Sequence, residues 1–272
     1  RKTYEDLGSF DSDSNLLTVE NGILHLDTLE LTPHTHTNLS KILIPCAFIT
    51  PKFDDIEGNL KDTLFWKYLK NSFTVKGKFI KEDFDTVLEV MASVFIKHQI
   101  DEKSVMFLGN GENGKSVCLD YLSSLIGKNN ISHIPLHKLA EDKFAMAKLD
   151  GKLANVFADL EKNELRHTGC IKGISSGEPC FVQNKGKDGF DLYPMCKLIF
   201  STNKFPKVFD QTQGFFRRWI IVKWERNFEN DPDRISNLKD TLIENQEEKN
   251  LVFSSLMKLA EHLKTKGKFT NT

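Results

Sequence analysis

The stretch of sequence that decides the fold reads SVMFLGNGENGKSV, from Ser104 to Val117. Its second part matches the pattern G-x-x-x-x-G-K-[ST] in full, between Gly109 and Ser116. A short apolar run leads into the motif, and a segment with apolar residues at helical spacing leads out of it. A strand, a glycine-rich turn and a helix in this order predict a loop that wraps phosphate groups.

The residue types in this loop suit a chain of phosphates. Glycines permit left-handed turns and a close approach of backbone N–H groups to an anion. The following helix presents unpaired N–H groups and the positive end of its dipole. Lys115 would place a cation on the β- and γ-phosphates, and the Ser116 hydroxyl would ligate Mg²⁺. The expected binding residues are Gly109, Asn110, Gly111, Glu112, Asn113, Gly114, Lys115, Ser116 and Val117. The alternative is a glycine–asparagine turn that happens to precede a lysine.

Outward from the loop, apolar strands alternate with helical segments. The pattern predicts a helix over 115–126, with Gly127 as its stop, and strands over 105–108, 153–158, 197–201 and 219–223. This alternation favours an α/β fold with a mostly parallel sheet. We expect four ranges in the chain: a β/loop N-terminal region (1–55), with a hairpin at Asn21-Gly22, a helical region (56–100), the α/β core (101–225) and C-terminal helices (226–272).

The composition is that of an ordinary globular chain. Its 272 residues are 39% hydrophobic and 28% charged, and the net charge is −1. Any affinity for nucleic acid must therefore come from a local basic cluster. The sequence holds no run of 18 apolar residues, so we expect no membrane partner. Five cysteines without a CxxC or zinc spacing indicate free thiols in a reducing cytoplasm. The start at Arg1 has no signal peptide, and we expect part of a longer protein.

A phosphate-binding loop that supports hydrolysis needs an acidic partner for Mg²⁺ and for the attacking water. The apolar run 153–158 ends in Asp159, which could hold Mg²⁺ through its water shell. Glu161 follows two residues on, and if the strand continues both carboxylates face the same side. Glu161 could then polarise water. Taken alone, an acid after a strand marks only the end of that strand.

Two further polar signals follow along the chain. The strand 197–201 leads to Asn203, whose amide could orient water against a γ-phosphate or could simply form a turn before Pro206. Arg217 and Arg218 stand directly before the strand 219–223. Because neighbours on a strand point in opposite directions, we expect the two arginines to have different partners. One could act as an arginine finger on a neighbouring subunit's nucleotide, or both could be exposed charges at a strand end.

The order of these motifs resembles that of superfamily 3 helicases of the AAA+ class, and more closely the poxvirus-type and phage/plasmid primase–helicases. The resembling segments read NGILHLDTLELTPHT, FLGNGENGKSV, KLDGKLANVFADL, KGISSGEPCFVQNKGKDGF, KLIFSTNKFPKVFD and GFFRRWIIVKW. The resemblance implies an AAA+ P-loop NTPase core that binds ATP and Mg²⁺, forms a ring, hexameric in such proteins, and moves along single-stranded DNA. It also implies a fused or associated primase or polymerase domain.

The resemblance assigns roles to individual residues. Lys115 and Ser116 match the Walker A lysine and hydroxyl, Asp159 the Walker B acid and Asn203 sensor 1, while Arg217 or Arg218 matches the finger. Many relatives have glutamate or two adjacent acids at Walker B, whereas Leu160 follows Asp159 here. Whether Asp159 or Glu161 acts as the base stays open.

A predicted β-hairpin over 181–190 carries Lys185 and Lys187 at its polar tip. In superfamily 3 the hairpin before sensor 1 projects into the central pore, and this implies that both lysines contact DNA. In a ring, several copies would surround one strand with positive charge. A solvated hairpin tip is the alternative, and Lys172 is a weaker candidate. The leading functional hypothesis is an ATP-dependent DNA helicase module. A small-molecule kinase and a non-catalytic, ATP-binding assembly platform are the alternatives.

Overall fold

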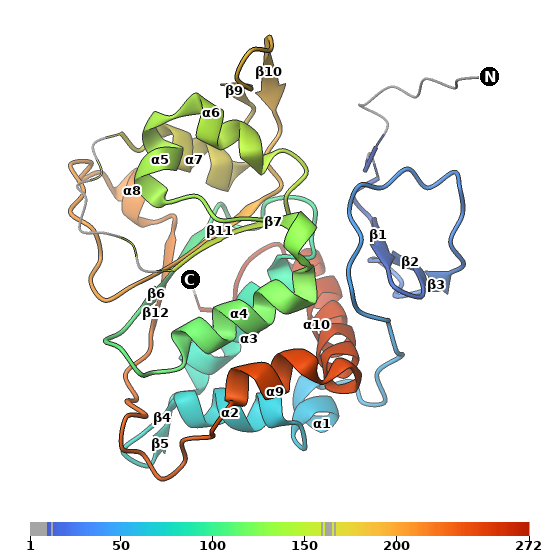
Figure 1. The fold of residues 1–272 in the computed structure, drawn as a ribbon, viewed down its shortest axis with the longest axis vertical. Coiled ribbons are helices and arrows are strands. Elements are labelled where there is room, and N and C mark those ends of the chain that lie inside the picture. The colour runs from blue at the N-terminus through green and yellow to red at the C-terminus, as the bar shows by residue number, and fades with distance from the viewer. Residues whose placement is uncertain (1–9, 12, 159, 161–164, 166, 272) are drawn as a thin grey trace.

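A parallel sheet of five strands forms the centre of the molecule, seen in the computed structural model in Figure 1. The structure describes residues 10–271 except 12, 159, 161–164 and 166. The sheet has the strand order β12-β6-β11-β8-β7. The strands span Ser104–Leu108 (β6), Ile131–Ser132 (β7), Ala154–Phe157 (β8), Lys197–Thr202 (β11) and Trp219–Lys223 (β12). The predicted α/β fold with a mostly parallel sheet is thus confirmed, with C-terminal helices after it.

Both faces of the sheet are buried, which explains why its strands read as continuous apolar runs. Neighbouring residues of one strand point to opposite faces. Val105 and Phe107 of β6 pack into one hydrophobic cluster, while Met106 packs into the other. On β11, Ile199 and Phe200 divide in the same way.

Helices from both ends of the chain cover the first face. They are α3 (Lys81–Ser93), α4 (Lys115–Ile126), α9 (Leu238–Glu244) and α10 (Gln246–Lys266). Helix α10 packs on α3, and α9 packs on α4 (Figure 1). The same cluster includes Leu17 and Phe65, so the N-terminal regions share one core with the sheet. One hydrophobic cluster therefore contains residues from all four predicted ranges, and the division of the chain into these ranges stays a prediction.

Short helices and a hairpin cover the second face. The helices are α5 (Leu136–Glu141), α6 (Lys143–Met146), α7 (Gly169–Ser176) and α8 (Gln213–Phe216). Strands β9 (Cys180–Gln183) and β10 (Gly189–Leu192) pair antiparallel and project beyond these helices at the top of Figure 1. The hairpin predicted over 181–190 is therefore present.

The N-terminal part consists of a small sheet and a helical region. Strands β1 (Leu16–Val19) and β2 (Gly22–His25) form the predicted hairpin, and β3 (Leu31–Thr32) pairs with β2. The turn is Glu20-Asn21, one residue before the predicted one, because Gly22 already pairs with Val19. Helices α1 (Ile56–Leu60) and α2 (Leu64–Ser72) follow, and the short strands β4 (Thr74–Val75) and β5 (Lys78–Phe79) separate α2 from α3. No described helix is long and apolar enough to cross a membrane.

Most predicted elements agree with the structure, and the deviations involve short or polar segments. Helix α4 and strand β12 have the predicted bounds. The two-residue strand β7 and the β4–β5 pair were not predicted, because two residues carry no periodic signal. The C-terminal helices begin at Leu238, within the predicted range 226–272 but well after its start. Among the described residues before them, those at 224–237 form no helix and pack against the phosphate-loop turn.

Candidate functional site

The turn between β6 and α4 depends on glycine at both of its ends. A Cβ atom at Gly109 would overlap the carbonyl oxygen of Trp224 and the amide of Asn113. Gly114 adopts a left-handed conformation (φ 88°), and a Cβ atom there would lie 3.1 Å from the Tyr68 ring. A side chain in such a conformation costs roughly 1–2 kcal/mol. The motif glycines are therefore required by close packing at Gly109 and by backbone conformation at Gly114.

The side chains of Lys115 and Asn113 stabilise this turn from within through hydrogen bonds to backbone carbonyls. Both side chains are buried. The Lys115 ammonium donates to the carbonyl of Gly109 and, over 3.2 Å, to Oδ1 of Asn113. The Asn113 amide donates to the carbonyl of Asn110 and, over 3.1 Å, to that of Trp224. The turn thus positions a cation beside the N-terminus of α4, where the helix dipole also favours an anion.

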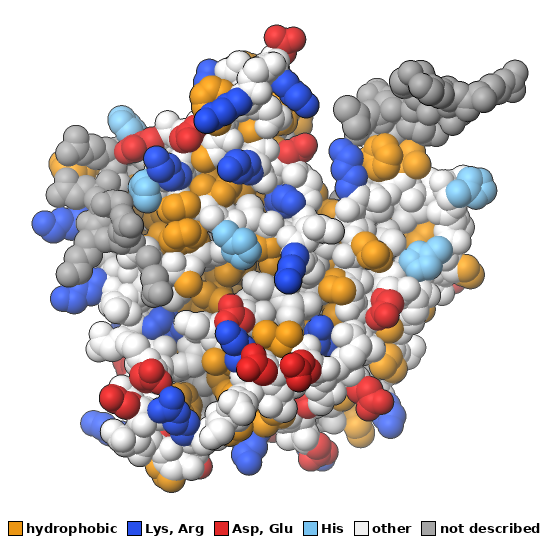
Figure 2. Space-filling view, viewed as in Figure 1, with side chains coloured by type: hydrophobic (Ala, Val, Ile, Leu, Met, Phe, Trp, Pro, Cys, Tyr) orange, Lys and Arg blue, Asp and Glu red, His pale blue; other side chains and the backbone are white. Residues whose placement is uncertain are grey.

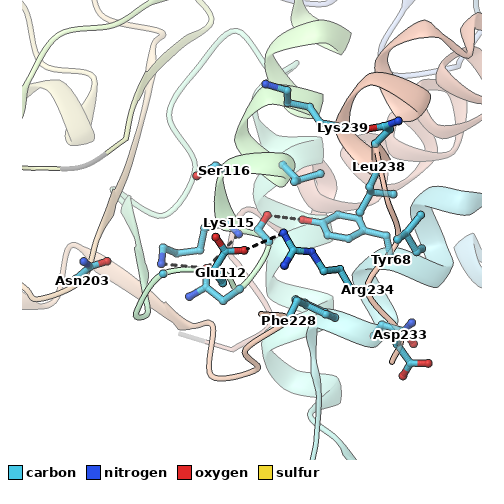
Figure 3. Close-up of a pocket in the computed structure, with 17 residues that line it drawn as sticks. Tyr68, Glu112, Lys115, Ser116, Asn203, Phe228, Asp233, Arg234, Leu238 and Lys239 are labelled. Carbon is cyan, nitrogen blue, oxygen red and sulfur yellow. Dashed lines mark hydrogen bonds and ion pairs between the residues drawn. The ribbon is translucent and has the colours of Figure 1, made fainter. Parts of the chain in front are cut away.

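A cavity of about 540 Å³ opens at this turn (Figure 3). Its walls come from four parts of the chain that are distant in sequence: the turn with the start of α4, helix α2, Asn203 after β11, and the segment after β12 that leads into α9. The end at Lys115 and Ser116 is polar, while Tyr68, Val117, Phe228 and Leu238 supply apolar surface. The cavity therefore offers a place for phosphates and, adjoining it, a place for a flat apolar group.

Tyr68 ties helix α2 to the phosphate-loop turn. Its hydroxyl donates to the carbonyl of Gly114 over 2.7 Å, and the same carbonyl accepts the backbone N–H of Cys118. Burial of the phenol raises the pKa of Tyr68 well above its ordinary value. Sequence reasoning missed this residue, because the lysine-rich stretch around it is typical of an amphipathic helix with a solvated face.

The segment after β12 folds over the tip of the turn. The backbone N–H of Phe228 donates to the carbonyl of Glu112 over 2.6 Å, and Nη2 of Arg234 lies 3.6 Å from a carboxylate oxygen of Glu112. Arg226 anchors the segment through two bonds of 2.8 Å to the Asp231 carboxylate. This pairing lowers the pKa of Asp231 and raises that of Arg226. None of these residues carries a local motif, so the sequence did not indicate them.

Asn203 lies where the sequence predicted it, beside the turn. Strand β11 is the neighbour of β6 in the sheet, and the backbone N–H of Gly109 donates to the carbonyl of Thr202 over 3.2 Å. Asn203 is exposed and lines the same cavity as Lys115 (Figure 3). The exposed Ser116 hydroxyl also faces this cavity.

The structure does not describe the two acidic partners that the sequence predicts for this site. Asp159 and Glu161 lie outside the described residues, so their predicted roles remain predictions. Strand β8, which precedes them, ends at Phe157 and is separated from β6 by β11. Within the described part of the chain, no cluster of three histidine, cysteine, aspartate or glutamate residues could hold a metal ion.

Arg217 and Arg218 lie at the opposite edge of the sheet from the turn. Strands β12 and β6 run parallel, with Trp219 beside Ser104 and Lys223 beside Leu108. The arginines are thus separated from the turn by the length of a strand, about 13 Å at roughly 3.3 Å per residue.

Contrary to the expectation, the two arginines share one partner, although Arg218 also has partners of its own. Nη2 of Arg217 and Nη2 of Arg218 lie 3.5 Å and 3.1 Å from the same carboxylate oxygen of Glu102. Arg217 caps the end of α8 rather than lying in the strand, so the alternation of a strand does not apply to it. The two differ in exposure: 63% of the Arg217 side chain is accessible, against 14% for Arg218, which also donates to Gly214 and Ser176.

Lys185 and Lys187 lie at the exposed tip of the β9–β10 hairpin, as predicted. Basic side chains gather around this projecting tip in Figure 2. Phe181 packs against Gly189 across the hairpin and remains 63% exposed. Lys172, the weaker candidate, pairs with Asp210 over 2.6 Å, and this pairing lowers the pKa of Asp210 well below its ordinary value. Its ammonium therefore already has a carboxylate partner.

Comparison with family models matches residues 107–218 to DUF5906, a family of unknown function. A protein of Invertebrate iridescent virus 3 named "Putative helicase 121R" is 24% identical over 83% of this chain and 24% of its own length. A protein of Invertebrate iridescent virus 6 named "Putative helicase 184R" is 24% identical over 57% of this chain and 17% of its own length. The chain thus matches a quarter or less of each of these relatives.

Solved structures show the same fold. The apo structure of the NrS-1 C-terminal region (305–718) has a TM-score of 0.56 at 13% identity, over 96% of this chain and 60% of that one. The A form of the NrS-1 C-terminal region has a TM-score of 0.55 at 14% identity, over 78% of this chain and 47% of that one. The likeness therefore extends from the sheet to most of the surrounding helices.

Proposed function

We propose that this chain is the motor module of an ATP-dependent replicative DNA helicase of the superfamily 3 type, coupling hydrolysis to movement along single-stranded DNA. One observation carries the proposal. The Gly-Lys-Ser turn lies at the polar end of a cavity of about 540 Å³, to which Tyr68, Val117, Phe228 and Leu238 add apolar surface. The viral relatives named as helicases support the same function.

The residues of the cavity suit the binding of ATP. Lys115 and the first N–H groups of α4 would contact the β- and γ-phosphates. The base would lie against Tyr68 and Leu238. Ser116 offers a hydroxyl oxygen, a donor type that Mg²⁺ prefers, and Asp159 is the second predicted ligand. Bound Mg²⁺ would neutralise charge that develops on the phosphates.

The hydrolytic step requires an oriented water. Asn203 would hold it from the end of β11, and Asp159 or Glu161 would accept its proton. The finger would come from a second copy in a ring, since both arginines lie a strand length from their own turn. Arg217 is the better suited of the two, because most of its side chain is exposed.

DNA would contact the hairpin tip. Lys185 and Lys187 are exposed on the β9–β10 hairpin, which projects beyond the neighbouring helices (Figure 1), and in a ring of six copies their charges would surround one strand. The exposed Phe181 ring could stack on a base. Because the chain matches only part of its relatives, we include in the proposal a primase or polymerase domain, fused or associated.

ATP turnover with and without single-stranded DNA, beside a mass measurement in solution, tests this function. We expect DNA to stimulate turnover and Lys115→Ala to abolish it. Lys128→Ala, an exposed lysine just beyond the far end of α4, is the matched control and should leave turnover unchanged. Full activity of Lys115→Ala would overturn the proposal. Turnover that depends on a metabolite and ignores DNA would indicate a kinase, and tight binding without turnover would indicate an assembly platform.

A further inference from the structure

A second cation lies at the mouth of the cavity that holds Lys115. Arg234 lines this cavity from the segment after β12, and its guanidinium points toward Glu112 in Figure 3. Nη1 donates to the carbonyl of Glu229 over 3.1 Å, while Nη2 lies 3.6 Å from a carboxylate oxygen of Glu112. About half of each side chain is accessible. The ammonium of Lys115 is therefore not the only positive charge that a bound anion would meet.

Glu112 is an unexpected residue in a loop that wraps phosphates. It lies between Gly111 and Asn113 with a left-handed backbone (φ 57°), and its carboxylate lines the cavity. A carboxylate near a bound triphosphate repels it unless a cation compensates. Arg234 is the cation that the structure places against it.

The segment that carries Arg234 is held on both sides of the cavity. Nη1 of Arg226 donates to the carbonyl of Asn71 in α2, and Nη2 reaches Asp233, the neighbour of Arg234, over 2.7 Å. The backbone of Phe228 bonds to the phosphate-loop turn. These contacts fix the backbone near Arg234, so that only its side chain must rotate to change partner.

A triphosphate should outcompete Glu112 for this guanidinium. An ion pair between half-exposed side chains contributes at most about 1 kcal/mol. Phosphate oxygens accept two parallel bonds from an arginine and carry more charge than a carboxylate. The exchange therefore becomes favourable once an anion with several charges enters.

From this geometry we infer that Arg234 binds the terminal phosphates of the nucleotide of its own subunit, and that Glu112 holds it as a counter-ion before the nucleotide enters. The inference rests on the proposed ATP site and adds a residue to it. Arg234 would then make binding sensitive to the number of phosphates, because AMP would leave the guanidinium paired with Glu112.

Equilibrium binding of a non-hydrolysable ATP analogue, ADP and AMP to single variants tests this inference. We expect Arg234→Gln to weaken binding of the ATP analogue by about tenfold or more, as the loss of a charge-assisted contact implies, and that of AMP by less than twofold. Glu112→Gln should strengthen binding of the analogue. Lys239→Gln is the matched control: it removes one positive charge from the same cavity, but Lys239 pairs with Asp120 on the outer side of α4.

The outcomes separate this inference from the proposed function. If Lys115→Ala leaves binding of the analogue unchanged, the ATP site itself is wrong. If Lys115→Ala abolishes binding while Arg234→Gln weakens all three nucleotides equally, or none, only the role of Arg234 fails. Equal losses in Lys239→Gln and Arg234→Gln would show a general charge effect and would also overturn it.

Discussion

The two edges of the parallel sheet differ in what they present. At the carboxyl ends of the strands lie the Gly109–Ser116 turn and Asn203, gathered around one cavity. At the opposite edge lie Arg217 and Arg218, which both pair with Glu102. The hairpin with its two lysines extends from the same edge, because β10 leads into the start of β11. One subunit therefore cannot bring its own arginines to its own turn. The motifs that follow one another along the chain thus lie on two separate surfaces, and for this reason we propose cooperation between copies.

Mixing variants of the two edges tests this division and should have the largest effect. We expect Arg217→Ala to lower ATP turnover at least a hundredfold, because a finger stabilises charge in the transition state. Mixed with Lys115→Ala, the arginine variant should regain part of its turnover. At some interfaces, the intact Lys115 of one variant would meet the intact Arg217 of the other. No recovery at any mixing ratio would contradict action between subunits, and Arg218→Ala in the same assay shows which arginine acts.

Replacing both hairpin lysines should separate DNA contact from catalysis. Lys185→Ala/Lys187→Ala removes the exposed charges of the tip without touching the cavity. Basal turnover should persist, while stimulation by single-stranded DNA is lost and the salt dependence of DNA binding becomes shallower. Exposed lysines elsewhere, for example Lys128 and Lys148, offer a control with the same charge change. If single-stranded DNA still stimulates ATP turnover of the hairpin variant, the two lysines do not contact DNA as proposed.

A smaller effect is expected from Tyr68, whose hydroxyl donates to the phosphate-loop turn. Tyr68→Phe deletes one hydrogen bond to the Gly114 carbonyl, worth about 1 kcal/mol, and should weaken ATP binding several-fold. Tyr121→Phe is the matched control, because the Tyr121 hydroxyl is buried with no hydrogen-bond partner among the described residues. Its loss should leave ATP binding unchanged. Equal behaviour of the two variants would mean that Tyr68 only fills space.

The last expected effect concerns stability rather than ATP turnover, at the arginine edge. Lys197 begins β11, and its ammonium donates to the carbonyls of Ile96, His98 and Met195. Burial lowers the pKa of Lys197 to about 7. The unfolded chain then binds more protons than the folded one between pH 7 and the ordinary lysine pKa, so stability rises with pH in that window. Thermal unfolding at pH 6 and pH 9 should show this gain, and Lys197→Met should lack it. An equal pH response of both proteins would contradict the shift.

The prediction of the fold succeeded where the signal is local and repeated. Strand β12 and helix α4 were predicted with their observed bounds, since apolar runs and the Gly127 stop mark them in the chain. The strand β7 and the path of the segment before Leu238 were not predicted. Short or polar segments take their shape from what they pack against, and no periodicity records that.

The sequence by itself determined the phosphate-loop turn, the order of the strands and helices along the chain and the lysine-bearing hairpin, because each is written in neighbouring residues. Only the tertiary structure decided that Tyr68 supports Gly114, that Arg234 faces Glu112 and that Glu102 holds both arginines. These contacts join residues that are more than 40 positions apart. Their partners are selected by the shape and charge of the folded core, and a linear pattern carries neither.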